Sequence, residues 1–126
     1  MRSIILACLA LVALGGATPA LPHHSIANFD QTKKVTIKGK VTFFRLTSPH
    51  SHIDIEVADA TGATRTYKIF TVGKTVMTRS GWTSEDIKAG DQVTAIGNPD
   101  RTDPTFMYLT QMVFASGKTW NWDLIP

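Results

Sequence analysis

Strict alternation of apolar and polar residues constrains the fold of this chain more than any other sequence feature. Residues 35–43 carry Val, Ile, Gly, Val and Phe at the odd positions, with Thr or Lys at the even positions. Residues 52–57 repeat the pattern, with His52, Asp54 and Glu56 on the polar side. A period of two predicts strands with one face in a core and one in solvent. Gly39, inside the first run, predicts a bend or bulge.

The order of the remaining elements indicates the architecture. A turn at residues 59–62 and a strand at 65–70 complete a hairpin, and Val72, Val76 and Ser80 fit one face of a short helix that ends at Gly81. Residues 84–91 predict a helical turn and a tight turn, followed by strands at 92–97 and 106–114. Three strands, a helix and two strands predict an all-β fold with one short helix, a five-stranded Greek-key barrel of the oligonucleotide/oligosaccharide-binding (OB) type. A split, open β-sandwich is the alternative.

The first twenty residues predict a cleaved export signal. Arg2 precedes an apolar run at 4–14 and small residues at 15–20, and the run is too short for a stable membrane span. We therefore expect a signal peptide at 1–20, an N-terminal arm at 21–34 and a barrel domain at 35–126, in the periplasm or secreted. Cys8, the single cysteine, leaves with the signal, so neither a disulfide nor a thiolate metal site is expected.

Charge and motifs exclude two broad classes of function. The chain has 13 basic and 10 acidic residues spread along its length, with Lys33 and Lys34 as the one adjacent basic pair. This distribution does not predict a nucleic-acid partner. Ser25 and Asp30 lack the surrounding motif of a hydrolase, so we expect no enzymatic activity and no catalytic residues.

Four histidines in two close pairs are the candidate ligands. His50 and His52 are two residues apart on a predicted strand and so share a face, which allows both to bind one ion. The adjacent His23 and His24 point to opposite faces if extended, so at most one of them would join the strand pair. Imidazole ligands without sulfur suit copper or zinc. The competing interpretation is a solvated polar strand face.

Several motifs together resemble one family of small exported bacterial proteins. They are His-His-Ser-Ile-Ala-Asn-Phe-Asp at 23–30, Lys-Lys-Val-Thr-Ile-Lys-Gly-Lys-Val at 33–41, Ser-Pro-His at 48–50, Arg-Ser-Gly-Trp at 79–82 and Lys-Ala-Gly-Asp at 88–91. The chain is similar to domain of unknown function family 6152. The resemblance implies a secreted or periplasmic single domain of uncharacterised role. The family's shared motif positions fall on His23, His24, Ser25, Phe29, Asp30, Pro49 and His50. Relatives often carry an aromatic residue in place of His52, which favours His50 acting with the arm.

Two functional hypotheses follow. In the first, the arm folds back so that His23 or His24 meets His50, with His52 and Asp30 as further ligands or supporting groups, and the protein binds copper ahead of zinc. In the second, the protein is a cell-envelope module that binds a protein or glycan without metal. The structural alternative to the metal site is that Phe29 docks the arm in the core while the histidines cap a strand end. We interpret four aromatic residues as core residues, and stacking on a sugar or a base is the less favoured alternative. They are Tyr67, Phe106, Trp120 and Trp122.

Overall fold

Strand β1 takes part in two pairings and so turns the sheet into a barrel. The structure is a computed structural model that describes residues 26–122. The first half of β1 (Val35–Arg45) pairs antiparallel with β4 (Gln92–Pro99), and its second half pairs antiparallel with β2 (His50–Ala58). Gly39 lies near the crossover, where a Cβ atom would collide with the carbonyl oxygen of Glu56. The glycine predicted to mark a bend therefore allows two strands to approach closely.

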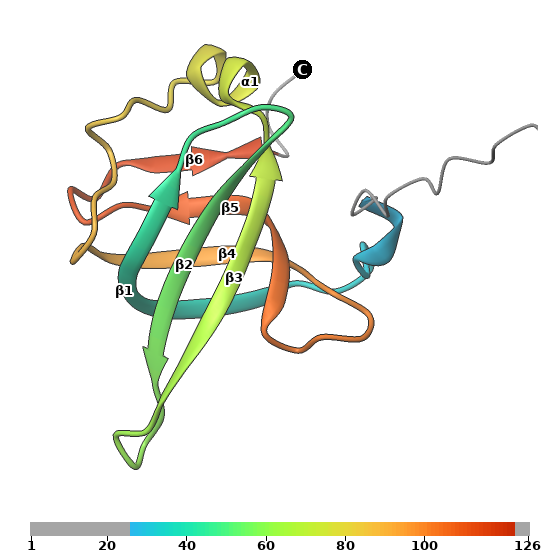
Figure 1. The fold of residues 1–126 in the computed structure, drawn as a ribbon, viewed down its shortest axis with the longest axis vertical. Coiled ribbons are helices and arrows are strands. Elements are labelled where there is room, and N and C mark those ends of the chain that lie inside the picture. Colours follow the sequence, from blue (N-terminus) through green and yellow to red (C-terminus); the bar gives the residue numbers. More distant parts are fainter. Residues whose placement is uncertain (1–25, 123–126) are drawn as a thin grey trace, which may run out of the picture.

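The barrel closes through a parallel contact between β3 (Thr64–Val72) and β5 (Phe106–Val113). The strand order is β3-β2-β1-β4-β5-β6, and the additional β3–β5 pairing joins the two sides, so that β1 to β5 form a closed barrel (Figure 1). The predicted OB-type barrel is confirmed, and closure excludes the open sandwich. A short sixth strand, β6 (Thr119–Asn121), extends the sheet beyond β5 and was not predicted.

The short helix lies between β3 and β4, as predicted, but with a different buried face. Helix α1 spans Lys74–Arg79 and Gly81 follows with φ of 93°. Met77 is the buried helix residue, whereas Val76 is 39% exposed. The predicted helix face began at Val72. Because Val72 belongs to β3, its position is not set by the spacing of residues in the helix. Residues 84–91 form hydrogen-bonded turns rather than a helical turn, because the carboxylates of Asp86 and Asp91 accept the backbone N–H groups of Thr83 and Lys88.

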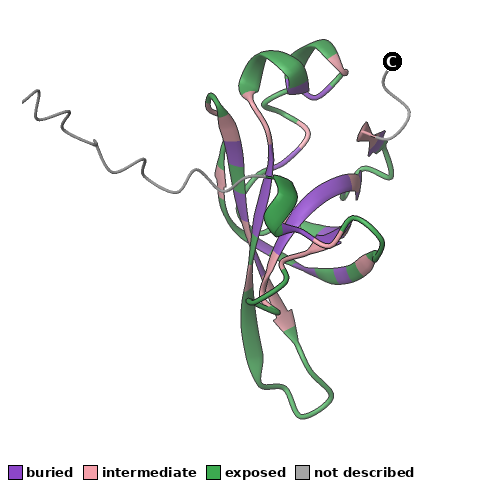
Figure 2. Cartoon of the chain, turned by 90° about the vertical axis from the view of Figure 1, so that its right-hand side faces the viewer, coloured by how far each residue is buried: buried purple, intermediate pink, exposed green. Residues whose placement is uncertain are grey.

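A tryptophan closes the core beside α1. Trp82 is fully buried and stacks on Phe44 at 6.1 Å between ring centroids, with Phe114 and Trp120 packed edge-on at 4.7 and 5.3 Å. The indole N–H of Trp120 donates to the Ser80 hydroxyl at 2.7 Å. Trp120 is therefore a core residue that attaches β6 to the end of the helix. In Figure 2 the buried residues follow the barrel strands, whereas the tip of the β2–β3 hairpin is exposed.

A β-bulge corrects the predicted orientation of Phe43. The alternation places Phe43 inside with Val41, but the register shifts between these two residues, so that Thr42 and Phe43 together oppose Asp54. Phe44 takes the inward position instead, and Phe43 is 46% exposed on the outer face. One extra residue inverts the alternation, a change that periodicity alone does not predict.

Candidate metal-binding site

A second hydrophobic cluster lies on the outside of the barrel, over β3 and β5. Its buried members are Phe29, Phe70 and Tyr108, and Phe106 packs against them. Phe29 is 0% exposed, with ring centroids 6.1 Å from Phe70, 5.2 Å from Phe106 and 5.6 Å from Tyr108. Phe29 belongs to the arm, so its side chain docks the arm onto the barrel's outer surface. The docking by Phe29 that belongs to the structural alternative to the metal site is present, but in a cluster separate from the barrel core.

Backbone hydrogen bonds hold the same part of the arm in place. The arm enters through a 3-10 helix, η1 (Ile26–Asn28), and Phe29 forms an isolated β-bridge with Asp100. The N–H of Asp30 donates to the Pro99 carbonyl at 2.8 Å, and the N–H of Arg101 donates to the Asn28 carbonyl at 3.0 Å. The arm is thus fastened to the end of β4 and to the β4–β5 loop on both sides of Phe29 (Figure 1).

His50, at the first position of β2, has the geometry of a ligand whose second nitrogen is fixed. Its Nδ1 lies 3.3 Å from the carbonyl oxygen of Thr71, and its ring centroid lies 4.2 Å from that of Phe70. A carbonyl only accepts hydrogen bonds, so Nδ1 is the donor in this contact, and in the neutral ring Nε2 then carries the lone pair. Metal-binding histidines commonly have this arrangement, which sets the tautomer and the ring orientation.

His52 lies on the same strand face, as its spacing predicts. It is exposed, it pairs with Phe70 in the strand register, and its ring meets the edge of Phe70 at 5.4 Å between centroids. His50, His52 and Phe29 therefore all contact one ring, that of Phe70. Sequence reasoning missed Phe70. The signal was present, because counting outward from the hairpin turn at Asp59 and Ala63 places Phe70 opposite His52.

The carboxylate of Asp30 interacts with two residues that follow it closely in the sequence. One oxygen, Oδ1, accepts the backbone N–H of Thr32 at 3.1 Å and its hydroxyl at 2.6 Å, while Oδ2 lies 3.3 Å from the ammonium of Lys33. The hydrogen bonds from Thr32 are the largest cause that lowers the pKa of Asp30 to about 2. This carboxylate therefore closes the turn between the arm and β1.

The other predicted ligands, His23 and His24, lie outside the described residues, as do Ser25 and the expected signal peptide. Within residues 26–122, no cluster of three or more His, Cys, Asp or Glu side chains is arranged to hold a metal ion. A centre with three protein ligands would need at least one ligand from outside the described residues, where the predicted ligands His23 and His24 lie. His24 precedes Ile26, the first described residue, by two positions, which an extended chain spans in about 7 Å.

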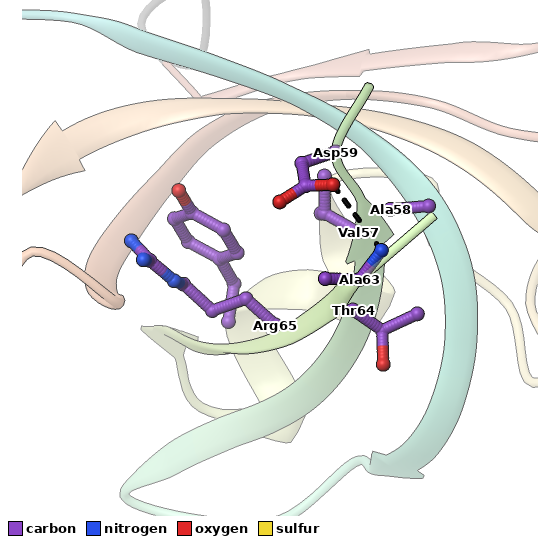
Figure 3. A pocket seen from close by; sticks show the side chains of 7 residues that line it. Val57, Ala58, Asp59, Ala63, Thr64 and Arg65 are labelled. Carbon is purple, nitrogen blue, oxygen red and sulfur yellow. Dashed lines mark hydrogen bonds between the residues drawn. The ribbon is translucent and has the colours of Figure 1, made fainter. Parts of the chain in front are cut away.

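A hollow at the tip of the β2–β3 hairpin is separate from this site. Figure 3 shows its lining, in which the carboxylate of Asp59 accepts the N–H of Ala63 across the turn. Asp59 also accepts the N–H and hydroxyl of Thr61, and these bonds lower the pKa of Asp59. Its polar groups therefore serve to shape the turn.

The comparisons with known proteins establish a family. The model of a family of unknown function, DUF6152, matches residues 10–107. The chain belongs to this family. No curated protein matches the chain. Among residues 26–122, none of the helices has the length and apolar character that crossing a membrane requires.

Solved structures resemble the chain in fold. The mitochondrial single-stranded DNA binding protein Rim1 of S. cerevisiae aligns with a TM-score of 0.50 at 15% identity, over 65% of this chain and 93% of that protein. A ZRD-deleted mutant of TiaS, solved with agmatine, aligns at 0.47 and 15% identity over 68% of this chain and 22% of its own. The priB protein of Ralstonia solanacearum aligns at 0.39 and 10% identity, over 64% and 96% of the two chains. At 15% identity the likeness to Rim1 shows the fold alone.

Proposed function

We propose that this member of the family binds a transition metal ion in the cell envelope, copper ahead of zinc, without catalysing a reaction. The ligands are His50 together with His23 or His24 of the arm, and His52 is an auxiliary ligand. The observation that carries the proposal is the hydrogen bond from Nδ1 of His50 to Thr71, which leaves Nε2 as a free ligand atom. Asp30 is omitted from the ligand set because Thr32 and Lys33 engage both of its oxygens.

The docking of Phe29 supports convergence of the arm on His50. Phe29 and His50 contact the same ring, and the backbone bonds on both sides of Phe29 fix the residues that follow the histidine pair. A short connection to a fixed anchor raises the local concentration of the arm's imidazoles near β2. Bringing a histidine of the arm to His50 then costs little additional chain entropy.

Copper is placed ahead of zinc because the proposed ligands are all imidazoles and because Cu²⁺ exceeds Zn²⁺ in affinity for a given set of nitrogen ligands. Export signals of the type predicted at 1–20 deliver proteins across the inner membrane, which supports a periplasmic or secreted location. N-terminal sequencing of the exported protein tests both the cleavage site and the location.

Native mass spectrometry and calorimetry of the exported protein with Cu²⁺ and with Zn²⁺ test the metal site. We expect uptake of one ion per chain, lost in His50→Ala and weakened but retained in His52→Ala. Affinity should fall below about pH 6, because a protonated imidazole has no lone pair to donate. Absence of uptake near neutral pH, or uptake that His50→Ala leaves intact, would refute the proposal.

A further inference from the structure

A hollow lies between α1 and the end of β1. It has a volume of about 460 Å³, and its lining comes from three segments of the chain. They are Leu46 directly after β1, Lys74 and Thr78 on α1, and residues 82–84, which follow the helix. The N–H of Lys74 donates to the Thr47 carbonyl at 2.9 Å and so holds the start of α1 beside the β1–β2 loop. Pockets that bind small molecules begin at about 300 Å³, so this hollow is large enough for one.

The lining of the hollow includes a residue with an unsatisfied hydrogen-bond donor. Within residues 26–122, one buried side-chain nitrogen or oxygen atom lacks a hydrogen-bond partner, and it is Nε1 of Trp82. The neighbouring Trp120, by contrast, donates its indole N–H to Ser80. A buried N–H without an acceptor costs free energy, because it has lost its bonds to water and gained none in return. Since Trp82 lines the hollow, a ligand bound there can supply the acceptor.

The charges around the hollow favour an anion. Lys74 is exposed, and within residues 26–122 its ammonium takes part in no hydrogen bond or ion pair. Among the described residues, none of those that line the hollow is acidic. Of the two acids that follow residue 84, Glu85 does not line the hollow and Asp86 is paired with Lys118 at 2.8 Å. A cation without a carboxylate partner, together with an N–H without an acceptor, favours a carboxylate ligand.

The inner wall and the rim of the hollow differ in chemistry. The inner wall is apolar, since Trp82 is fully buried and Leu46 is half-buried. The rim is polar and consists of four exposed residues, which are Lys74, Thr78, Thr83 and Ser84. Exposed side chains change rotamer rapidly, so a ligand can pass them and bring an acceptor to the buried N–H. The apolar wall favours a ligand whose body is apolar.

We propose that this hollow binds a small carboxylic acid with an apolar body. The carboxylate accepts the indole N–H of Trp82 and pairs with the ammonium of Lys74, while the apolar body packs against Leu46. A carboxylate satisfies the donor and the cation together, whereas a neutral molecule of the same shape satisfies the donor alone. His50 and His52 do not line the hollow, so the inference is independent of the proposed metal site.

NMR titration of the exported protein with 3-phenylpropionate and hexanoate, and with the neutral amides of both acids, tests the inference. Dialysis against EDTA removes metal ions beforehand. The chain has three tryptophans, and the indole signal of Trp82 is identified by its proximity to the rings of Phe44 and Phe114. We expect at least one acid to move this indole proton downfield and to bind about tenfold more tightly than its amide.

Replacement of single lysines separates a specific ion pair from general attraction to a basic protein. Lys74→Met should weaken binding of the acid about fivefold and leave binding of the amide unchanged. Lys38→Met is the matched control, because Lys38 is also exposed and without an ion pair in the described part of the chain, but lies on β1 outside the hollow. The control should bind the acid as the wild type does. Both lysines are exposed, so neither change should prevent folding.

Three outcomes would overturn the inference. The first is that neither acid shifts the Trp82 indole proton at about 10 mM, a concentration that detects even weak complexes. If that proton also lies far upfield in the free protein, it donates to a neighbouring aromatic ring instead. The second is that the amides bind as tightly as the acids. The third is that Lys38→Met weakens binding of the acid as much as Lys74→Met does. Because the protein is free of metal, none of these outcomes depends on whether the histidines bind an ion.

Discussion

Replacement of Phe29 by alanine tests whether this side chain docks the arm. Phe29 is fully buried among three aromatic rings, and removing a buried phenylalanine side chain costs about 3 kcal/mol or more. The N–H of Asp30 is bonded to Pro99 across the same junction, so its protection against hydrogen exchange depends on the docked state. A loss of about 3 kcal/mol in docking free energy should accelerate exchange of this amide about 100-fold.

Denaturant unfolding and native-state hydrogen exchange measure the two effects of Phe29→Ala. Ile26→Ala is the matched control, because Ile26 lies on the same arm and is 50% exposed, so its truncation should change the unfolding free energy by less than about 0.5 kcal/mol. If Phe29→Ala behaves like the control in both measurements, the docking interpretation is wrong.

Three further predictions concern the stability of the fold. Gly97→Ala should lower the unfolding free energy by about 2 kcal/mol in a denaturation experiment, because its Cβ would collide with a carbonyl of β5, and wild-type stability would contradict this. Lys118→Met should cost about 1 kcal/mol, since the ammonium contacts Asp86 at 2.8 Å and donates to a backbone carbonyl, and added salt should reduce the difference between variant and wild type. The folded-state pKa of Asp30 lies near 2, below the unfolded value, so its contribution is complete above about pH 4 and is lost as the pH falls towards 2. Asp30→Asn should remove this part of the acid dependence in unfolding measured between pH 4 and 2, and parallel pH profiles would refute it.

The barrel was predictable because period-two alternation and turn residues determine most of its strands. Each predicted strand is present, and the turn at Asp59 fixes the hairpin register. Three features were not predictable because they depend on tertiary contacts. Phe43 is turned outward by a bulge, Met77 rather than Val76 faces the core, and β6 is a three-residue strand held by the Trp120 bond to Ser80. A strand this short carries too little alternation to be recognised.

The sequence predicts which residues belong to the candidate site, but it does not predict how they are arranged in space. Spacing alone placed His50 and His52 on one face, which the structure confirms. The hydrogen bond from His50 to Thr71 and the shared contact with Phe70 depend on the alignment of β2 with β3, and the burial of Phe29 depends on a surface made by β3 and β5. Such long-range contacts are not encoded in local periodicity. Asp30 differs, because its partners Thr32 and Lys33 are two and three residues away, so its role in the turn is a local feature.

Electron paramagnetic resonance of the exported protein with one equivalent of Cu²⁺ tests the central proposal most directly, because nitrogen couplings count the imidazoles bound to copper. The proposal predicts at least two imidazole nitrogens in the wild type, a spectrum of unbound Cu²⁺ in His50→Ala, and an unchanged count with weaker binding in Phe29→Ala. A spectrum of unbound Cu²⁺ in the wild type, or the same nitrogen couplings in His50→Ala as in the wild type, would contradict it.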